Sequence, residues 1–113
     1  MSMKFKTREV NGVAVLDLSG KITMGEGSVT VRDAVKDELA KGHSKILLNL
    51  AEVSYIDSSG LGELVSAYTT AKNAGGEVKL LNLTKKVQDL LQITKLYTVF
   101  DVQDDEAAAV ASF

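Results

Sequence analysis

Two adjoining runs decide how the middle of this 113-residue chain folds: Ile46-Leu47-Leu48-Asn49-Leu50 and Ile56-Asp57-Ser58-Ser59-Gly60-Leu61-Gly62. The first is almost continuously apolar, which is typical of a central strand buried on both faces. After the second run begins, apolar residues recur at helical spacing, at Leu61, Leu64, Val65 and Tyr68. The two runs therefore predict a buried strand, a turn that carries adjacent serines, and a helix that begins near Ser58.

This turn brings hydroxyl groups to the start of the predicted helix. The first N–H groups of a helix have no partner within it, and the macrodipole adds partial positive charge, so a phosphate is well accommodated there. Gly60 and Gly62 remove side chains, so another backbone or protein surface can come close. The turn is suited to receiving a phosphoryl group or to docking. The alternative is that Asp57, Ser58 or Ser59 simply caps the helix, the common role of these residue types.

Outward from the turn, strands and helices alternate in the predicted order ββαβαβα(β)α. Strands are expected over 5–10, 13–18, 45–50 and 77–83, with a short last strand within 97–102. Helices are expected over 28–41 and 58–74, after a Thr84 cap, and after Asp104-Asp105-Glu106. Asn11-Gly12 predicts a hairpin turn. Strands separated by helices pair in parallel with right-handed crossovers, so the fold class is α/β with an antiparallel opening hairpin.

The loop 21–28 and the turn 57–62 should lie on one rim of this sheet. Both leave the carboxyl ends of predicted strands, where open α/β sheets bind ligands and partners. On the loop, Ile22 and Met24 are expected to be exposed apolar residues. In the turn and its helix, Leu61 and Val65 are expected to point into the core.

Composition narrows the function classes. A chain of this length predicts a single domain, residues 1–113. The net charge of −2 argues against nucleic acid as a partner, because phosphate neutralisation needs clustered Lys and Arg. The absence of cysteine excludes disulfides and thiolate metal sites. No apolar stretch reaches the roughly 20 residues of a membrane span, and the N-terminus lacks a secretory signal, so a soluble cytoplasmic protein without a membrane partner is expected.

Catalytic and metal-binding patterns are weak. His43 precedes the predicted strand 45–50 and Ser58 follows it, which separates them by roughly 20 Å at about 3.3 Å per residue and excludes a Ser-His-Asp triad. Asp104-Asp105-Glu106 lacks the ligand spacing of a calcium loop. Glu38 is expected as surface charge on the outer face of the helix 28–41. The sequence predicts no enzyme activity, no metal and no cofactor.

The run Asp57-Ser58-Ser59-Gly60-Leu61-Gly62 resembles the signature of the bacterial anti-sigma factor antagonists. The order of elements is similar to that of their domain, known as STAS (sulphate transporter and anti-sigma antagonist). The likeness extends to Leu18-Ser19-Gly20, to Gly75-Gly76 and to the helix after Leu83, and so spans essentially the whole chain. It implies a mixed, mostly parallel sheet of four to five strands with about four helices.

The resemblance also implies a function. In that family the first serine after the aspartate, here Ser58, is phosphorylated by the anti-sigma factor, an ATP-dependent serine kinase. The unphosphorylated antagonist binds the anti-sigma factor and releases the sigma factor, which regulates transcription. A metal-dependent serine phosphatase restores the binding form. The partner-binding residues implied here are Thr23, Met24, Asp57, Ser59, Gly60, Leu61 and Gly62.

One departure from the family pattern concerns the end of the second strand. Many members carry an aspartate there, in a Gly-x-Leu-Asp stretch, whereas this chain reads Gly20-Lys21-Ile22-Thr23. The acidic group is missing or displaced to Glu26. A second interpretation therefore stays open, in which the chain is a non-phosphorylated STAS scaffold or an accessory subunit of a signalling assembly or lipid transporter.

Overall fold

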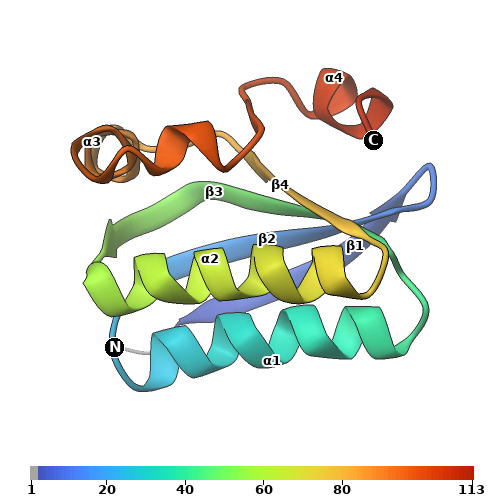
Figure 1. Cartoon of the computed structure of the whole chain (residues 1–113), viewed down its shortest axis with the longest axis horizontal. Helices are drawn as coiled ribbons and strands as arrows, with labels where there is room; N and C mark the ends of the chain where they lie inside the picture. Colours follow the sequence, from blue (N-terminus) through green and yellow to red (C-terminus); the bar gives the residue numbers. More distant parts are fainter. Residues whose placement is uncertain (1–2) are drawn as a thin grey trace.

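The computed structural model describes residues 3–113 and contains a sheet flanked by helices (Figure 1). In chain order the elements are β1 (Lys4–Val10), β2 (Val13–Ile22), α1 (Glu26–Ala40), β3 (Lys45–Ile56), α2 (Ser58–Asn73), β4 (Glu77–Leu81), α3 (Lys85–Thr94), the 3-10 turn η1 (Leu96–Thr98), β5 (Val102–Gln103) and α4 (Glu106–Ala111).

The sheet has five strands in the order β1-β2-β3-β4-β5. The β1–β2 hairpin is antiparallel, and every other pairing is parallel. The predicted mixed, mostly parallel α/β sheet is thus confirmed. Parallel neighbours end at the same edge of the sheet, so the segments that follow β2 and β3 leave from one rim.

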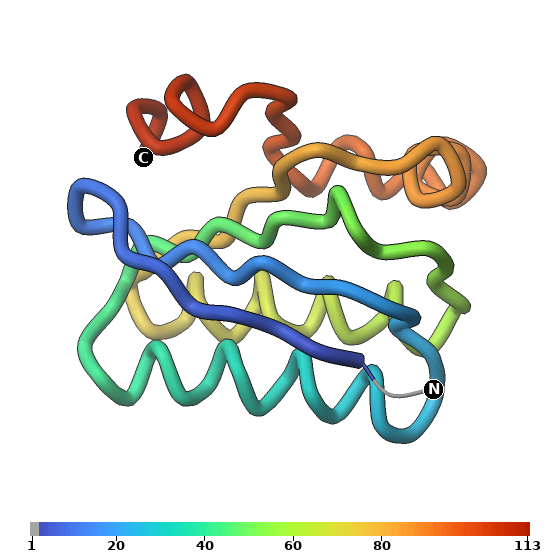
Figure 2. Tube along the Cα trace, turned by 180° about the vertical axis from the view of Figure 1, so that it is seen from behind, coloured from blue at the N-terminus to red at the C-terminus, as the bar shows by residue number. Residues whose placement is uncertain are grey.

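Helices cover both faces of the sheet, with α1 and α2 on one side and α3 and α4 on the other (Figures 1 and 2). The alternation of side chains along the strands supplies an apolar surface to each layer. From β2, Ala14 and Leu16 belong to the main core cluster, together with residues of α1 and α2. Val13 and Val15 point the other way, into a smaller cluster with Ala109 and Val110 of α4.

Strands β2 and β3 run further than their apolar runs predict. β2 continues to Ile22 and β3 to Ile56, because the two keep pairing through register irregularities as far as the pair Ile22 and Ile56. The last strand also differs, since residues 96–98 form a 3-10 turn and only Val102–Gln103 pairs with β4. The predicted caps are confirmed: Thr84 accepts from the Val87 N–H, and Asp105 from the Ala108 N–H.

A row of polar side chains crosses the sheet on the α4 side. Arg8 of β1 donates to the Asp17 carboxylate at 2.6 and 3.0 Å and to Glu106 of α4 at 2.7 and 3.2 Å. Asn49 of β3 donates to Asp17 Oδ1 at 2.8 Å, and Asn82 after β4 donates to Asn49 at 3.4 Å. The row therefore connects β1, β2, β3 and the residue that follows β4, and it borders the apolar cluster under α4.

Glu38 is a correction to the surface charge expected on the outer face of α1. It is only 2% exposed, and its Oε1 lies 2.5 Å from the His43 Nδ1. The Lys41 ammonium lies 3.5 Å from its other oxygen. The helical pattern misplaced Glu38 because a buried carboxylate is compensated by partners in the following loop, which periodicity does not register.

Candidate functional site

Asp57 organises the rim where α2 begins. Its Oδ1 accepts a hydrogen bond from the Gly60 N–H at 2.8 Å, so Asp57 is the cap of α2. Its Oδ2 accepts from the Met24 N–H at 3.1 Å, in the loop between β2 and α1. These N–H donors, Gly60 first and Met24 next, lower the pKa of the Asp57 carboxyl, because they stabilise its charged form. One carboxylate therefore ties the two loops of this rim together.

The two serines after Asp57 do not cap the helix, so their hydroxyl groups are available for other interactions. Ser58 and Ser59 are both exposed, and within residues 3–113 neither hydroxyl takes part in a hydrogen bond. Of the three residues that could cap the helix, Asp57 alone does so. The Ser58 hydroxyl thus stands at the first position of α2, accessible from solvent and not needed for the cap.

The two glycines of the turn differ sharply. Gly60 is buried, and a Cβ added to it would lie 1.9 Å from the Ile22 carbonyl oxygen. Around Gly62, apart from its chain neighbours and the backbone of α2 itself, no atom lies within 4 Å of such a Cβ. Gly60 is therefore required for close approach within the chain itself, whereas Gly62 leaves an open patch on the outer face of α2.

Two expected partner-binding residues are consequently corrected. Gly60 is enclosed against Ile22, and Leu61 is 4% exposed within the core, as its helical phase predicts. Neither offers a surface to a partner. Thr23, Met24, Ser59 and Gly62 remain at the rim, with Asp57 partly exposed between them.

In the loop region between β2 and α1, the predicted exposure is confirmed for Met24 and is wrong for Ile22. Met24 is 77% exposed, as expected of a residue without a place in the core. Ile22, expected to be exposed, is fully buried, because it is the last residue of β2 and packs beneath α2. The Thr23 carbonyl accepts from the N–H and the hydroxyl of Ser28, at 3.0 and 2.9 Å, which shapes the loop.

Loop and turn do share one rim, as the strand order predicts. The Asp57 N–H donates to the Ile22 carbonyl at 3.3 Å, in addition to the bond between Asp57 and the Met24 N–H. His43 lies at the other end of β3, beside Glu38. The two ends of this strand are therefore separate surfaces, and His43 is not part of the site.

Sequence reasoning missed an apolar surface next to this rim. Tyr55, near the end of β3, is 44% exposed and Ile93 of α3 is 78% exposed. They line a groove with Ile56, Lys86, Asp89 and Leu90. The longer β3 explains the omission, because residue 55 was expected to lie beyond the strand. The pair Tyr55-Ile56, aromatic and β-branched, was the available strand signal.

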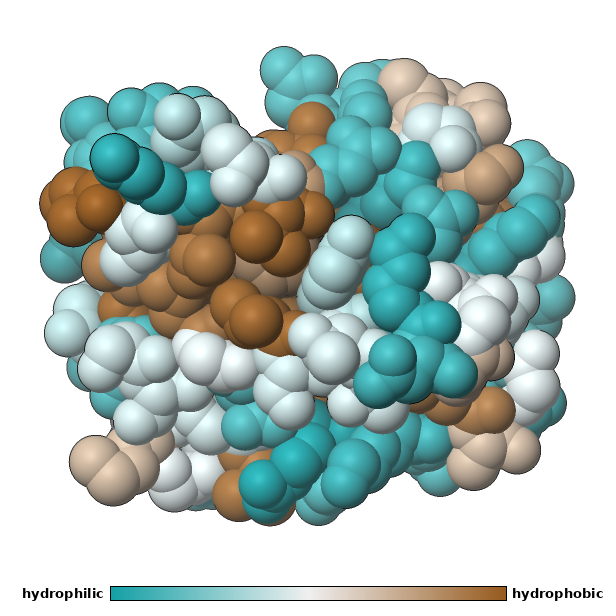
Figure 3. Space-filling view, in the orientation of Figure 1, coloured by the Kyte–Doolittle hydropathy of each residue, from teal (hydrophilic) through white to brown (hydrophobic). Residues whose placement is uncertain are grey.

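Further half-buried apolar side chains lie between α2 and α3, where Figure 3 shows hydrophobic surface. Val65 and Tyr68 of α2 contribute to it, with Leu90, Leu96 and Val99 from the α3 region. The ring of Tyr68 packs edge-on against Phe100, with centroids 5.7 Å apart. These side chains form the outer boundary of the main hydrophobic core.

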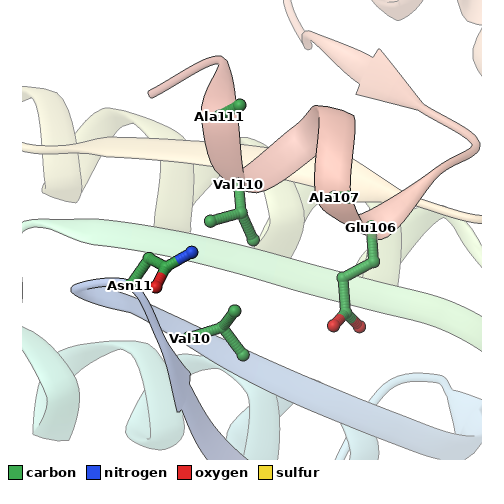
Figure 4. A pocket seen from close by; sticks show the side chains of 6 residues that line it. All are labelled: Val10, Asn11, Glu106, Ala107, Val110 and Ala111. Atoms are coloured by element: carbon green, nitrogen blue, oxygen red, sulfur yellow. The ribbon is translucent and has the colours of Figure 1, made fainter.

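A second pocket, of about 270 Å³, lies between the β1–β2 hairpin and α4 (Figure 4). Its lining is mostly apolar, from Val10, Val110 and the alanines of α4, with Asn11 and Glu106 at its border. The Glu106 carboxylate forms an ion pair with Arg8.

Among residues 3–113, no three His, Cys, Asp or Glu side chains gather closely enough to hold a metal ion. In the same described range, no helix has the length and apolar character needed to span a membrane.

Comparison with known proteins gives consistent results. The family model of the STAS domain matches residues 4–109. The chain is 25% identical over 111 residues to the anti-sigma F factor antagonist of Paenibacillus polymyxa, covering 97% of this chain and 94% of that protein.

Solved structures agree. A candidate anti-sigma factor antagonist from Thermotoga maritima has a TM-score of 0.87 at 29% identity, covering 96% of this chain and 92% of that one. The Bacillus cell fate determinant SpoIIAA in its phosphorylated form has a TM-score of 0.73 at 21% identity, covering 96% and 98%. The resemblance inferred from residues 57–62 is confirmed at the level of the family: this chain belongs to the STAS domain family.

Proposed function

We propose that this chain is a non-enzymatic, cytoplasmic anti-sigma factor antagonist, switched off by phosphorylation of Ser58. The observation that carries the proposal is the exposed Ser58 hydroxyl, which heads α2 while Asp57 supplies the cap. A kinase can therefore modify Ser58 without removing a bond that holds the fold. The family and its antagonist members support the general role.

The proposed partner is an anti-sigma factor that is also an ATP-dependent serine kinase. It would contact the rim through Met24, Thr23, Ser59 and Gly62, around Ser58. An exposed methionine suits such a surface, because its flexible thioether adapts to a partner. A metal-dependent serine phosphatase would return the chain to its binding form. Release of a sigma factor, and with it control of transcription, follows from binding the anti-sigma factor.

Charge explains how phosphorylation would act. A phosphoserine carries about −1.5 to −2 charges at pH 7. The neighbouring Asp57 carboxylate already occupies the Gly60 and Met24 N–H groups, so the new anion would add to an existing one. Burying both at an interface costs desolvation and repulsion. An effect of several kcal/mol, on the order of a thousandfold in affinity, is expected without any refolding.

The test uses a kinase-type anti-sigma factor encoded by the same genome, purified with this chain and ATP. Mass spectrometry should find one phosphoryl group, on Ser58. Ser58→Ala should abolish labelling, whereas Ser44→Ala, a matched control at the opposite end of β3, should retain it. Calorimetry should then give strong binding before phosphorylation and weak binding after it.

Two results would contradict the proposal. Labelling on Ser59, Thr23 or Thr30 would overturn the assignment of Ser58. Binding that is equal before and after modification would overturn the switch. A chain that binds without ever being labelled would favour the scaffold role, to which the missing aspartate after β2 also points.

A further inference from the structure

We infer that the groove between the end of β3 and α3 is a second docking point for the same partner, fitting an acidic segment with an apolar anchor. Tyr55, Ile56, Lys86, Asp89, Leu90 and Ile93 line this groove, whose volume is about 270 Å³. The inference rests on the proposed function, since the occupant is a segment of the anti-sigma factor.

Exposed apolar side chains are the first argument. Single exposed hydrophobic residues are normal on protein surfaces, but neighbouring ones mark interaction sites. Ile93 is 78% exposed on α3, and Tyr55 is 44% exposed on the strand that it faces. An aliphatic or aromatic side chain inserted between them would be covered on both sides.

Charge is the second argument. Asp89, the acid in the groove, is already matched by the Lys85 ammonium at 3.3 Å. The Lys86 ammonium lies 5.7 Å from the centre of the Tyr55 ring, and no carboxylate within residues 3–113 forms an ion pair with it. Lys21 is the register partner of Tyr55 on β2, and in the same described range it also lacks an ion pair. The Lys86 ammonium beside the Tyr55 ring is thus available to an acidic ligand, and Lys21 adds positive charge on the neighbouring strand.

Position is the third argument. Ile56 directly precedes Asp57, and Lys21 directly precedes Ile22, whose carbonyl meets Gly60. The groove therefore continues the rim that carries Ser58. A partner that reaches Ser58 passes beside the groove and can fill it without a change in this chain.

A protein segment suits the groove better than a membrane. Attachment to anionic lipids relies on clusters of about four to eight Lys or Arg residues. Here one cation, Lys86, lines a small groove that also contains Asp89, and Lys21 lies only at the register position beside Tyr55 on β2. A peptide with one apolar side chain and one or two carboxylates matches both its size and its charge.

The test measures the affinity of the purified kinase-type anti-sigma factor for unphosphorylated variants by calorimetry. Ile93→Asp and Lys86→Glu should each weaken binding at least tenfold. Their charge-matched controls, Ser44→Asp and Lys45→Glu, lie at the opposite end of β3 and should bind as the wild type does. Ile93→Gln, which adds no charge, replaces Ile93→Asp if the latter melts at a lower temperature. The loss in Lys86→Glu should shrink at high salt, because the lost contact is electrostatic.

The outcomes are separable. If the wild type does not bind the anti-sigma factor, the proposed function fails. If the wild type binds and the groove variants match their controls, the groove inference alone is overturned. Binding of the wild type to phosphatidylserine vesicles, lost in Lys86→Glu, would overturn it in favour of a membrane surface.

Discussion

The Met24 N–H donates to the Asp57 carboxylate at 3.1 Å, across 33 residues of sequence. The same carboxylate accepts from the Gly60 N–H at 2.8 Å. A single side chain therefore closes the first turn of α2 and fixes the position of the loop that presents Met24. Cap and loop are coupled through two oxygens of one residue.

Replacing Asp57 should separate these two roles. Asp57→Asn keeps one acceptor oxygen and a good capping residue, whereas Asp57→Ala loses both. We expect the melting temperature to fall more for Asp57→Ala than for Asp57→Asn. Hydrogen exchange at the Met24 amide should accelerate in both, because Asn replaces one of the two accepting oxygens with an NH2 group that can only donate, and its remaining oxygen is used for the cap. Unchanged exchange at Met24 would contradict the coupling.

The glycines of the turn form a matched pair. Gly60→Ala forces a Cβ to within 1.9 Å of the Ile22 carbonyl oxygen, so it should destabilise the fold by about 1–3 kcal/mol or more. Gly62→Ala meets open space and improves helix propensity, so it should raise the free energy of unfolding by up to about 1 kcal/mol. Urea unfolding of both variants measures the difference. Equal effects would mean that the approach of Gly60 to β2 is unimportant.

Met24 offers a test of the binding rim that leaves the fold alone. Met24→Glu should weaken binding to the anti-sigma factor at least tenfold, about 1.4 kcal/mol. Stability should change by less than about 0.5 kcal/mol, because Met24 is exposed. Ser44→Glu, at the opposite end of β3, is the control for charge. Normal binding by Met24→Glu would exclude the loop from the interface.

Acid should destabilise this fold through its paired carboxylates. The Arg8 guanidinium lowers the pKa of Asp17, the Gly60 N–H lowers that of Asp57, and the Lys79 ammonium lowers that of Asp101. Each carboxyl binds its proton at higher pH in the unfolded chain than in the folded one. Their stabilisation is therefore complete near neutral pH and is lost as the pH falls below about 4.

Urea midpoints measured between neutral pH and pH 3 check this dependence. The midpoint should fall on the acid side, and Asp17→Asn should make that fall shallower, since it removes one of the linked carboxyls. A midpoint that stays constant with pH would contradict the pairing of these groups.

The element order was predictable because apolar periodicity and turn residues mark each strand and helix. Where the predicted strands were too short, the missing residues are held in the sheet by contacts between segments far apart in the sequence. After Leu50 the chain reads Ala51-Glu52-Val53-Ser54, where the continuous apolar run of the buried strand ends, yet β3 continues because β2 pairs with it. The same extension buries Ile22, which looked like a loop residue.

The candidate site was predictable in its centre and not at its edges. The Asp57-Ser58 turn is local, so residue types and spacing suffice to identify it. The bond from Met24 to Asp57 and the contact of Gly60 with Ile22 depend on how two strands align, which no local pattern contains. The Tyr55 groove depends in addition on where α3 packs.

The polar row across the sheet bears on how this chain avoids misfolding. Slippage of β2 by one residue would turn Asp17 away from Arg8 and Asn49, into the apolar layer beneath α1 and α2. A carboxylate without partners in that layer is strongly disfavoured. The neighbouring runs of Val, Leu and Ile could pair in several registers. The hydrogen bonds of Asp17 are lost in the shifted registers, so these few bonds favour the native one. The position of Ser58 at the rim thus depends on an aspartate near the middle of β2.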